Sequence, residues 1–210
     1  MTDLTNLYDA IIKGNLELSV STTKSAIDEG VDPQMIIKDF MIPAMDKIGG
    51  MFEDCDVFIP ELLLAARAMK GSLTLIQPLL TSGGAESNGK IIIGTVRGDL
   101  HDIGKNIVGS MLEGAGFQVI NLGNDVSPQK FIDAIQTYNP QIVAMSALLT
   151  TTMTSMETAV NAIREAGLRD KVKIMIGGAP VTANFSNKIG ADGYSDNANG
   201  AVKLARELIS

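Results

Sequence analysis

The second half of the chain repeats one pattern that strongly limits its fold. From residue 90 onward, short apolar runs rich in β-branched residues alternate with stretches of helical character. The runs cover residues 91–96, 117–122, 142–145, 172–176 and, more weakly, 192–195. Nearly continuous apolar strands joined by helical crossovers indicate a parallel sheet that is buried on both faces. The pattern therefore predicts a doubly wound α/β domain, Rossmann-like or flavodoxin-like, over residues 90–210.

Residues 1–82 differ, because their apolar side chains follow helical spacing and show no strand-like alternation. Short breaks divide this stretch into four segments, which predicts a four-helix bundle. Asp32 and Pro33 are typical of a helix start, and Pro43 predicts a kink or a break at Ile42. The run over residues 83–89 is a flexible linker by composition, so we place the domain boundary there.

Charge and composition exclude several kinds of partner. The net charge is −7 without any basic run, so we expect neither nucleic acid nor an anionic membrane as a partner. No apolar run approaches the ~18 residues of a membrane span, and no export signal is visible. The single cysteine, Cys55, allows no internal disulfide and is expected to be a small buried side chain. Together these features predict a cytoplasmic protein.

The only histidine of the chain, His101, follows the first predicted strand in a glycine-rich loop. Loops at the carboxyl ends of parallel strands are where such sheets bind ligands. Asp99 and Asp102 flank the histidine, and a metal-bound imidazole usually donates its second N–H to a carboxylate. One histidine and two aspartates are too few for a metal site made of protein ligands alone. If His101 binds a metal, the metal has to bring its other ligands with it.

Two further loops of the predicted sheet carry unusual residues. Ser146 and Thr150–Thr152 follow the third strand, where their hydroxyls would serve either a ligand or a helix N-cap. Gly177 and Gly178 follow the fourth strand and would permit either close approach by a ligand or a tight turn. Neither GxGxxG nor GxxxxGK[ST] follows the first strand, so a dinucleotide or a nucleoside triphosphate is not indicated.

These loops together resemble the cobalamin-binding family that includes methionine synthase and the corrinoid proteins of methyltransferase systems. The DxHxxG motif of that family stands here as Asp99-Leu-His101-Asp102-Ile103-Gly104, its SxL as Ser146-Ala-Leu148, and its GG as Gly177-Gly178. Residues 51–69 resemble the helical cap domain of the same family. The likeness therefore covers nearly the whole chain.

The resemblance implies cobalamin or a related corrinoid, bound base-off with His101 as the lower axial ligand of cobalt. In this interpretation Asp99 holds the imidazole, and Thr152 extends the hydrogen-bonded chain where the best-known members carry serine. Further assignments also come from the resemblance alone. They place Ser146, Leu148 and Thr150 along the pocket for the nucleotide tail, Gly177 and Gly178 against the nucleotide loop, Asp102, Ile103 and Gly104 in the binding motif, and Phe52 and Ile59 over the upper face. From the helical pattern alone, Phe52 and Ile59 would instead be ordinary bundle core.

The same resemblance implies a methyl carrier that cycles between cob(I)alamin and methylcobalamin. A substrate-specific methyltransferase would load it and a second methyltransferase, with tetrahydrofolate or coenzyme M as acceptor, would unload it. A reductive activase is a further expected partner, and we expect no independent catalytic site. Protonation along Asp99 and His101 would then couple cobalt ligation to the methylation state.

Three other classes of protein share parts of this pattern. A cobalamin-dependent sensor or regulator would need a DNA-binding helix-turn-helix, for which we find no segment and an unsuitable net charge. A mutase-type cobalamin-binding subunit does not place a four-helix cap ahead of its sheet domain. A plain flavodoxin-like or receiver domain leaves His101 and the helical segment unexplained.

Overall fold

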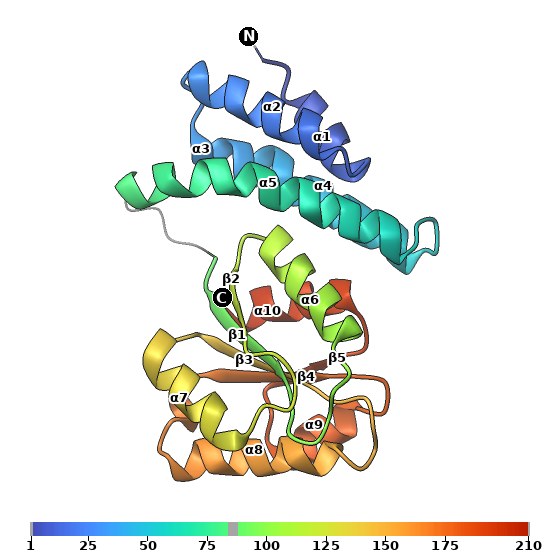
Figure 1. Cartoon of the computed structure of the whole chain (residues 1–210), viewed down its shortest axis with the longest axis vertical. Helices are drawn as coiled ribbons and strands as arrows, with labels where there is room; N and C mark the ends of the chain where they lie inside the picture. The colour runs from blue at the N-terminus through green and yellow to red at the C-terminus, as the bar shows by residue number, and fades with distance from the viewer. Residues whose placement is uncertain (1, 84–87, 210) are drawn as a thin grey trace. The chain divides into compact units, whose positions relative to one another are not determined.

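The computed structural model of the chain describes residues 2–83 and 88–209. It contains two compact units (Figure 1). One comprises Met1–Ser87 with Glu113–Gly116, and the other comprises Asn88–Leu112 with Phe117–Ser210. Of the predicted linker, residues 84–87 lie outside the described part. Residue 83 belongs to a helix, so the helical segment extends to the first residue of the predicted linker.

The first unit is helical, as predicted. Its elements are α1 (Thr5–Ile12), α2 (Leu16–Asp28), α3 (Pro33–Met35), the π-helical turn η1 (Ile36–Met41), α4 (Ile42–Glu53) and α5 (Ile59–Gly83). Since α3, η1 and α4 follow one another without interruption, the described part of this unit has four helical segments.

Local sequence signals explain where two of these helices begin. The Asp32 side chain accepts a hydrogen bond from the Gln34 amide, and Pro33 occupies the first turn, as predicted. At Pro43 the helix is not broken: the chain is π-helical up to Met41 and α-helical from Ile42. A proline has no N–H and its ring clashes with the carbonyl four residues earlier, and a wider π turn relieves both problems.

A cluster of hydroxyls in the core of the helical unit joins α2 to α5. The Ser19 and Ser72 Oγ atoms lie 2.7 Å apart, and Thr23 Oγ1 donates to Ser72 Oγ over 2.9 Å. All three side chains are fully buried. Cys55, by contrast, is exposed and has a positive φ of 62°, so the expectation that it is buried is wrong. It lies in the loop between α4 and α5.

The second unit is a five-stranded, all-parallel sheet with the order β2-β1-β3-β4-β5. Its strands are β1 (Lys90–Thr95), β2 (Gln118–Asn121), β3 (Ile142–Ser146), β4 (Lys173–Gly177) and β5 (Gly193–Ser195). This is the flavodoxin-like order among the two types that the sequence left open. The connection after β1 leads to one side of the sheet, to β2, and the connection after β3 leads to the other side, to β4. A crevice therefore opens at the carboxyl ends of the neighbouring strands β1 and β3.

Helices cover both faces of this sheet (Figure 1). One face carries α7 (Pro128–Tyr138), α8 (Met153–Glu165) and α9 (Ala183–Ile189), which share a large apolar core with the strands. The other face carries α6 (Ile103–Gly114) and α10 (Ala198–Ile209). A short 3₁₀ turn, η2 (Arg169–Lys171), precedes β4. In the described part of the chain, no helix has both the length and the apolar character needed to cross a membrane.

Candidate functional site: the carboxyl edge of the sheet

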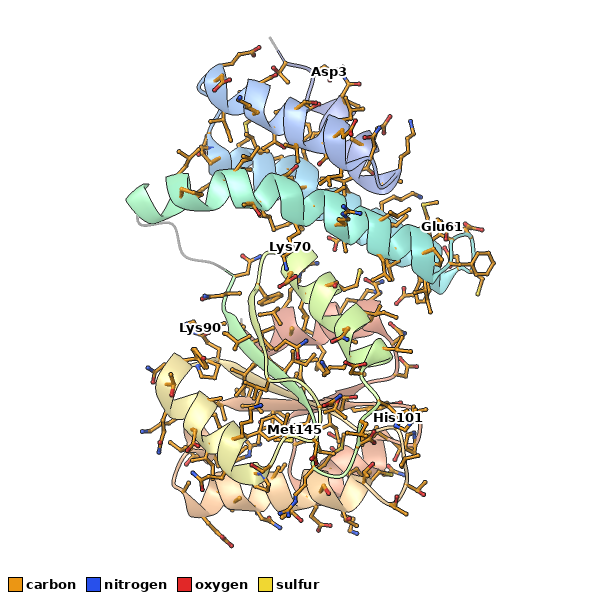
Figure 2. The ribbon with its side chains drawn as sticks, in the orientation of Figure 1. Asp3, Glu61, Lys70, Lys90, His101 and Met145 are labelled. Atoms are coloured by element: carbon orange, nitrogen blue, oxygen red, sulfur yellow. The ribbon has the colours of Figure 1, made fainter. Side chains whose placement is uncertain are left out.

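His101 lies in the loop between β1 and α6 (Figure 2). Thr95 at the end of β1 donates its hydroxyl to the His101 carbonyl over 3.0 Å, and the His101 amide donates to Asp99 Oδ1 over 3.0 Å. The imidazole Nδ1 lies 2.8 Å from the same carboxylate oxygen. The loop thus fixes both the backbone and the ring of His101, while half of its side chain (52%) stays exposed.

Asp99 is the centre of this arrangement. Its side chain is completely buried, and its second oxygen, Oδ2, accepts from the Leu148 amide at 2.7 Å and from Thr152 Oγ1 at 2.7 Å. The Leu149 amide lies at 3.3 Å from the same oxygen. One carboxylate therefore ties the loop after β1 to the loop after β3, across the crevice where the sheet changes direction.

The hydrogen bonds keep this carboxylate ionised. Burial raises the pKa of Asp99, but the bonds from the Thr152 hydroxyl and from the Leu148 and His101 amides outweigh burial. The pKa of Asp99 is therefore held well below its usual range. An ionised carboxylate can accept a hydrogen bond but cannot donate one. Asp99 therefore selects the imidazole tautomer that carries its hydrogen on Nδ1.

The remaining imidazole nitrogen is available to a ligand. Among the described residues, His101 Nε2 has no hydrogen-bond partner, and the ring borders a cavity of about 590 Å³. We call this cavity the groove; it opens at the carboxyl edge of β1, β3 and β4 and is bounded by α6 and α10. Its lining includes Ile93, Leu100–Lys105, Val108, Ala144–Leu148, Met175–Ala179, Ser195–Ala198 and Ala201.

Most residues that the sequence singled out meet at this groove. Its lining contains His101, Asp102, Ile103, Gly104, Ser146, Leu148, Gly177 and Gly178. Asp99 and Thr152 lie behind the histidine in the hydrogen-bonded chain. Thr150 is exposed and is not part of the lining. Phe52 (α4, half-buried) and Ile59 (α5, exposed) belong to the helical unit.

The two glycines after β4 have different surroundings. A Cβ on Gly178, whose φ is +127°, would collide with the carbonyl oxygen of Ala147, so a glycine is needed where the loops after β3 and β4 meet. A Cβ on Gly177 would lie 3.0 Å from the Ser195 carbonyl oxygen. Both glycines thus serve the close packing of the chain's own backbone at the groove. Gly104, in contrast, has no atom within 4 Å of an added Cβ and leaves the helix surface open to a ligand.

Two parts of the groove were not predicted. The end of β5 and the loop after it contribute Ser195, Asp196 and Asn197. The sequence predicts this strand only weakly, so its loop was not expected to take part in the site. Lys105 in the first turn of α6 is almost completely buried, and its Nζ donates to the side-chain oxygens of Asn106 and Asn121. Burial lowers the pKa of Lys105. A lysine on the polar side of a helix start is normally read as solvated, so sequence pattern gives no sign of this burial.

Comparison with protein families assigns both halves of the chain. Residues 89–203 match the B12 binding domain family, and residues 4–77 match a second family that is also described as a B12 binding domain. The first match contains every strand of the sheet, and the second contains nearly all of the helical unit.

Known relatives match over the whole length. Trimethylamine corrinoid protein 2 of Methanosarcina mazei is 42% identical over 203 residues, covering 96% of this chain and 93% of the relative. A corrinoid protein of Desulfitobacterium hafniense (strain Y51) is 36% identical, covering 100% of this chain and 98% of the relative. This chain therefore belongs to the family of B12-binding corrinoid proteins.

Solved structures agree with this assignment. A cobalamin-binding protein from Desulfitobacterium hafniense DCB-2 has a TM-score of 0.83 at 33% identity, and the match covers 100% of both chains. The methanol:cobalamin methyltransferase complex MtaBC from Methanosarcina barkeri has a TM-score of 0.85 at 29% identity, covering 98% of this chain and 79% of the other.

The residues at the groove fit a corrinoid. His101 offers one nitrogen with a fixed tautomer, which suits a metal whose other ligands come from a macrocycle. Among the described residues, no group of three or more His, Cys, Asp or Glu side chains is placed to hold a metal ion. Beside the histidine the groove provides room for a long substituent, and the open backbone at Gly104 leaves its wall accessible.

Proposed function

We propose that this protein is a methyl carrier that takes a methyl group from a substrate-specific methyltransferase and delivers it to a second one. The observation that carries the proposal is the free Nε2 of His101, held at the edge of a groove by a buried, ionised aspartate. When bound, a corrinoid supplies a cobalt centre that can receive a methyl group and release it. The trimethylamine corrinoid proteins and the methanol:cobalamin methyltransferase complex among its relatives support this function.

In this proposal His101 would be the protein residue that binds the cobalt in place of the cofactor's own base. Asp99 keeps the proton on Nδ1, so that the lone pair of Nε2 faces outward for coordination. The Thr152 hydroxyl and the Leu148 amide hold Asp99 in turn. The groove, with Ser146, Leu148, Gly177 and Gly178 in its lining, would hold the nucleotide tail that no longer reaches the metal. Thr150 would contact it only at the rim.

The helical unit has a separate proposed role. Phe52 and Ile59 are assigned to the upper face of the cofactor, where they would exclude water from the methyl group. Ile59 is 42% exposed, so it is not part of the bundle core and is accessible for such a contact. Residues 1–82 would act as the cap, residues 83–89 as the linker that lets it move, and residues 90–210 as the cofactor domain.

The partners follow from the same proposal. One methyltransferase would supply the methyl group, and a methylcorrinoid:acceptor methyltransferase would pass it to tetrahydrofolate or coenzyme M. A reductive activase would restore the protein after oxidation of the metal.

Labelling with ¹⁵N tests the axial ligand directly. The protein is loaded with hydroxocobalamin and reduced to the paramagnetic Co(II) form, whose electron-paramagnetic-resonance spectrum is split by the axial nitrogen. Protein grown on ¹⁵N should change this splitting if the nitrogen belongs to His101, and should leave it unchanged if the nitrogen belongs to the cofactor. His101→Ala should abolish the protein-derived splitting, whereas Thr151→Ala, a change at an exposed neighbouring hydroxyl, should retain it. A colourless wild-type protein would contradict the proposed function.

A further inference from the structure

The segment after β2 carries a bulge beside the loop between β1 and α6. Ile93 pairs with Asn121 in the sheet, and beyond the strand ends Val96 pairs with Val126. Between these two pairs the first segment advances three residues and the second advances five, so residues 122–125 contain two extra residues. An insertion of this kind bends the path of the chain and redirects its side chains, and such bulges are frequent next to functional sites.

The bulge binds three consecutive residues of the β1–α6 loop. The Gly98 amide donates to Asp125 Oδ1 over 2.7 Å, and the Asp125 amide donates to the Asp99 carbonyl over 3.0 Å. The Asn124 side-chain amide donates to the Leu100 carbonyl over 3.3 Å. The segment after β2 thus fixes the backbone directly before the histidine, whereas the loop after β3 holds the Asp99 side chain.

Asp125 supplies an acceptor for a turn in this backbone. Residues 96–99 form a turn that is closed by the Asp99 amide, which donates to the Val96 carbonyl over 3.1 Å. Gly98 is the third residue of the turn and has a φ of +84°, a feature of type II turns. Its amide does not close the turn and donates instead to the Asp125 carboxylate. The carboxylate therefore fixes the orientation of the turn from which Asp99 extends.

The backbone of Asp125 has a conformation that residues other than glycine rarely adopt. Its φ is +49°, in the left-handed region, which is unfavourable for a residue with a Cβ and is tolerated best by Asp and Asn. The residue is exposed, so apolar packing does not explain this conformation. What accompanies it is a pair of hydrogen bonds, one through Oδ1 and one through the amide, to the successive residues Gly98 and Asp99.

We propose that Asp125 is a positioning residue for His101, which acts by fixing the turn that leads to Asp99. This inference rests on the proposed function, in which His101 Nε2 binds the cobalt. A ligand atom that is already held in place loses less conformational freedom on binding, so its bond to the metal is favoured. Without the Asp125 carboxylate the Gly98 amide would lose its acceptor, and His101 would occupy a wider range of positions.

The test measures binding of aquocobinamide, a corrinoid without a nucleotide tail, to the ligand-free protein. On binding, Nε2 of the imidazole replaces one cobalt-bound water, which is released, and the visible spectrum reports the exchange. Asp125→Gly removes the carboxylate and suits the left-handed conformation, so this variant should fold. It should bind aquocobinamide at least about fivefold more weakly than the wild type. Asp125→Asn keeps an oxygen acceptor and tolerates the same conformation, so it should bind within about twofold of the wild type.

Asn139→Gly is the matched control. Asn139 is also exposed, has a φ of +47°, and precedes β3, so it lies at the opposite, amino edge of the sheet. Its replacement should leave the affinity for aquocobinamide within about twofold of the wild type, even where urea unfolding shows a loss of stability. A purely structural role of Asp125 predicts the same behaviour for Asp125→Gly.

Two results would overturn the inference. One is wild-type affinity in Asp125→Gly, and the other is an Asp125→Asn variant that binds as weakly as Asp125→Gly, because the acceptor oxygen would then not be the reason. His101→Ala separates these failures from a failure of the proposed function. It should bind aquocobinamide far more weakly than every other variant, and wild-type affinity in His101→Ala would contradict the proposed metal ligand itself.

Discussion

Both units expose large apolar side chains, but their surroundings differ. In the sheet unit Leu100, Ile103 and Leu148 border the groove beside His101, and all three are more than 40% exposed. In the helical unit Phe58, Ile59 and Leu63 are similarly exposed at the start of α5, where Ile59 and Leu63 lie one turn apart on the same helix face.

This difference indicates that the two units would contact a ligand in different ways. The sheet unit places its apolar surface around a rigid polar centre, because Asp99 joins two loops by several hydrogen bonds. Such a centre can hold one atom, Nε2, in a defined position. In the described part of the helical unit, the bonded hydroxyls of Ser19, Thr23 and Ser72 are buried in the core and not at this exposed apolar area. The contribution of that area to a ligand would therefore be shape and exclusion of water. Substitutions in the two regions should therefore affect different measurements.

The largest effect on stability is expected for Asp99→Ala. It leaves the His101, Leu148 and Thr152 donors without their buried acceptor, which should lower the free energy of unfolding by about 3 kcal/mol or more. Urea unfolding of the ligand-free protein measures this loss. Asp133→Ala, at an exposed position on α7, should change stability by less than about 0.5 kcal/mol. Equal losses in the two variants would show that the Asp99 network contributes nothing special.

The stability of the fold at acid pH should also depend on the Asp99 carboxylate. The pKa of Asp99 is lower in the folded state than in the unfolded chain, so its ionised form stabilises the fold. This contribution is complete above the ordinary carboxyl pKa of about 4 and is lost as the pH falls below it. Between about pH 5 and pH 2.5, the wild type should lose more stability than Asp99→Asn, by up to about 1.4 kcal/mol per pH unit. Parallel pH curves for the two proteins would contradict the assigned direction of the pKa shift.

A smaller effect is expected for Thr152→Val, which keeps the shape of the side chain and removes the hydroxyl. Asp99 Oδ2 would lose one donor and keep the Leu148 amide, so we expect a loss of about 1–2 kcal/mol in urea unfolding. Thr152→Ser retains the hydroxyl and should recover most of the loss. A serine variant as unstable as the valine variant would show that the methyl group, and not the hydrogen bond, matters at this position.

The sheet could be predicted from sequence because each of its signals is local. Apolar β-branched runs mark the strands, and a parallel sheet brings all their carboxyl ends to one edge, so residues as distant as His101 and Ser146 could be expected near one another. Strand order remained open, since the flavodoxin-like and Rossmann-like orders use the same local pattern. The register that places Ile93, Ala144 and Met175 in one row also depends on pairing between distant segments.

Other features depend on packing that no local pattern encodes. The hydroxyl cluster of Ser19, Thr23 and Ser72 reads as solvated polar residues in the sequence, yet it is fully buried. Lys105 is likewise buried because Asn121, sixteen residues away, comes to lie beside it. Cys55 shows the reverse error: its apolar character suggested burial, while the loop geometry between α4 and α5 exposes it.

The smallest effect on stability should come from the helical surface, at Ile59→Ser. Ile59 and Leu79 are both 42% exposed on α5, so Leu79→Ser is a matched control. Both variants should unfold within about 0.5 kcal/mol of the wild type. They should differ in the loaded protein, when cyanide is added and its binding to cobalt is followed in the visible spectrum. Ile59→Ser should speed cyanide binding several-fold, because the side chain assigned to shield the upper face has been shortened and made polar, whereas Leu79→Ser should leave the rate unchanged. Equal rates in the two variants would remove Ile59 from the cap and leave its exposure as an ordinary feature of the surface.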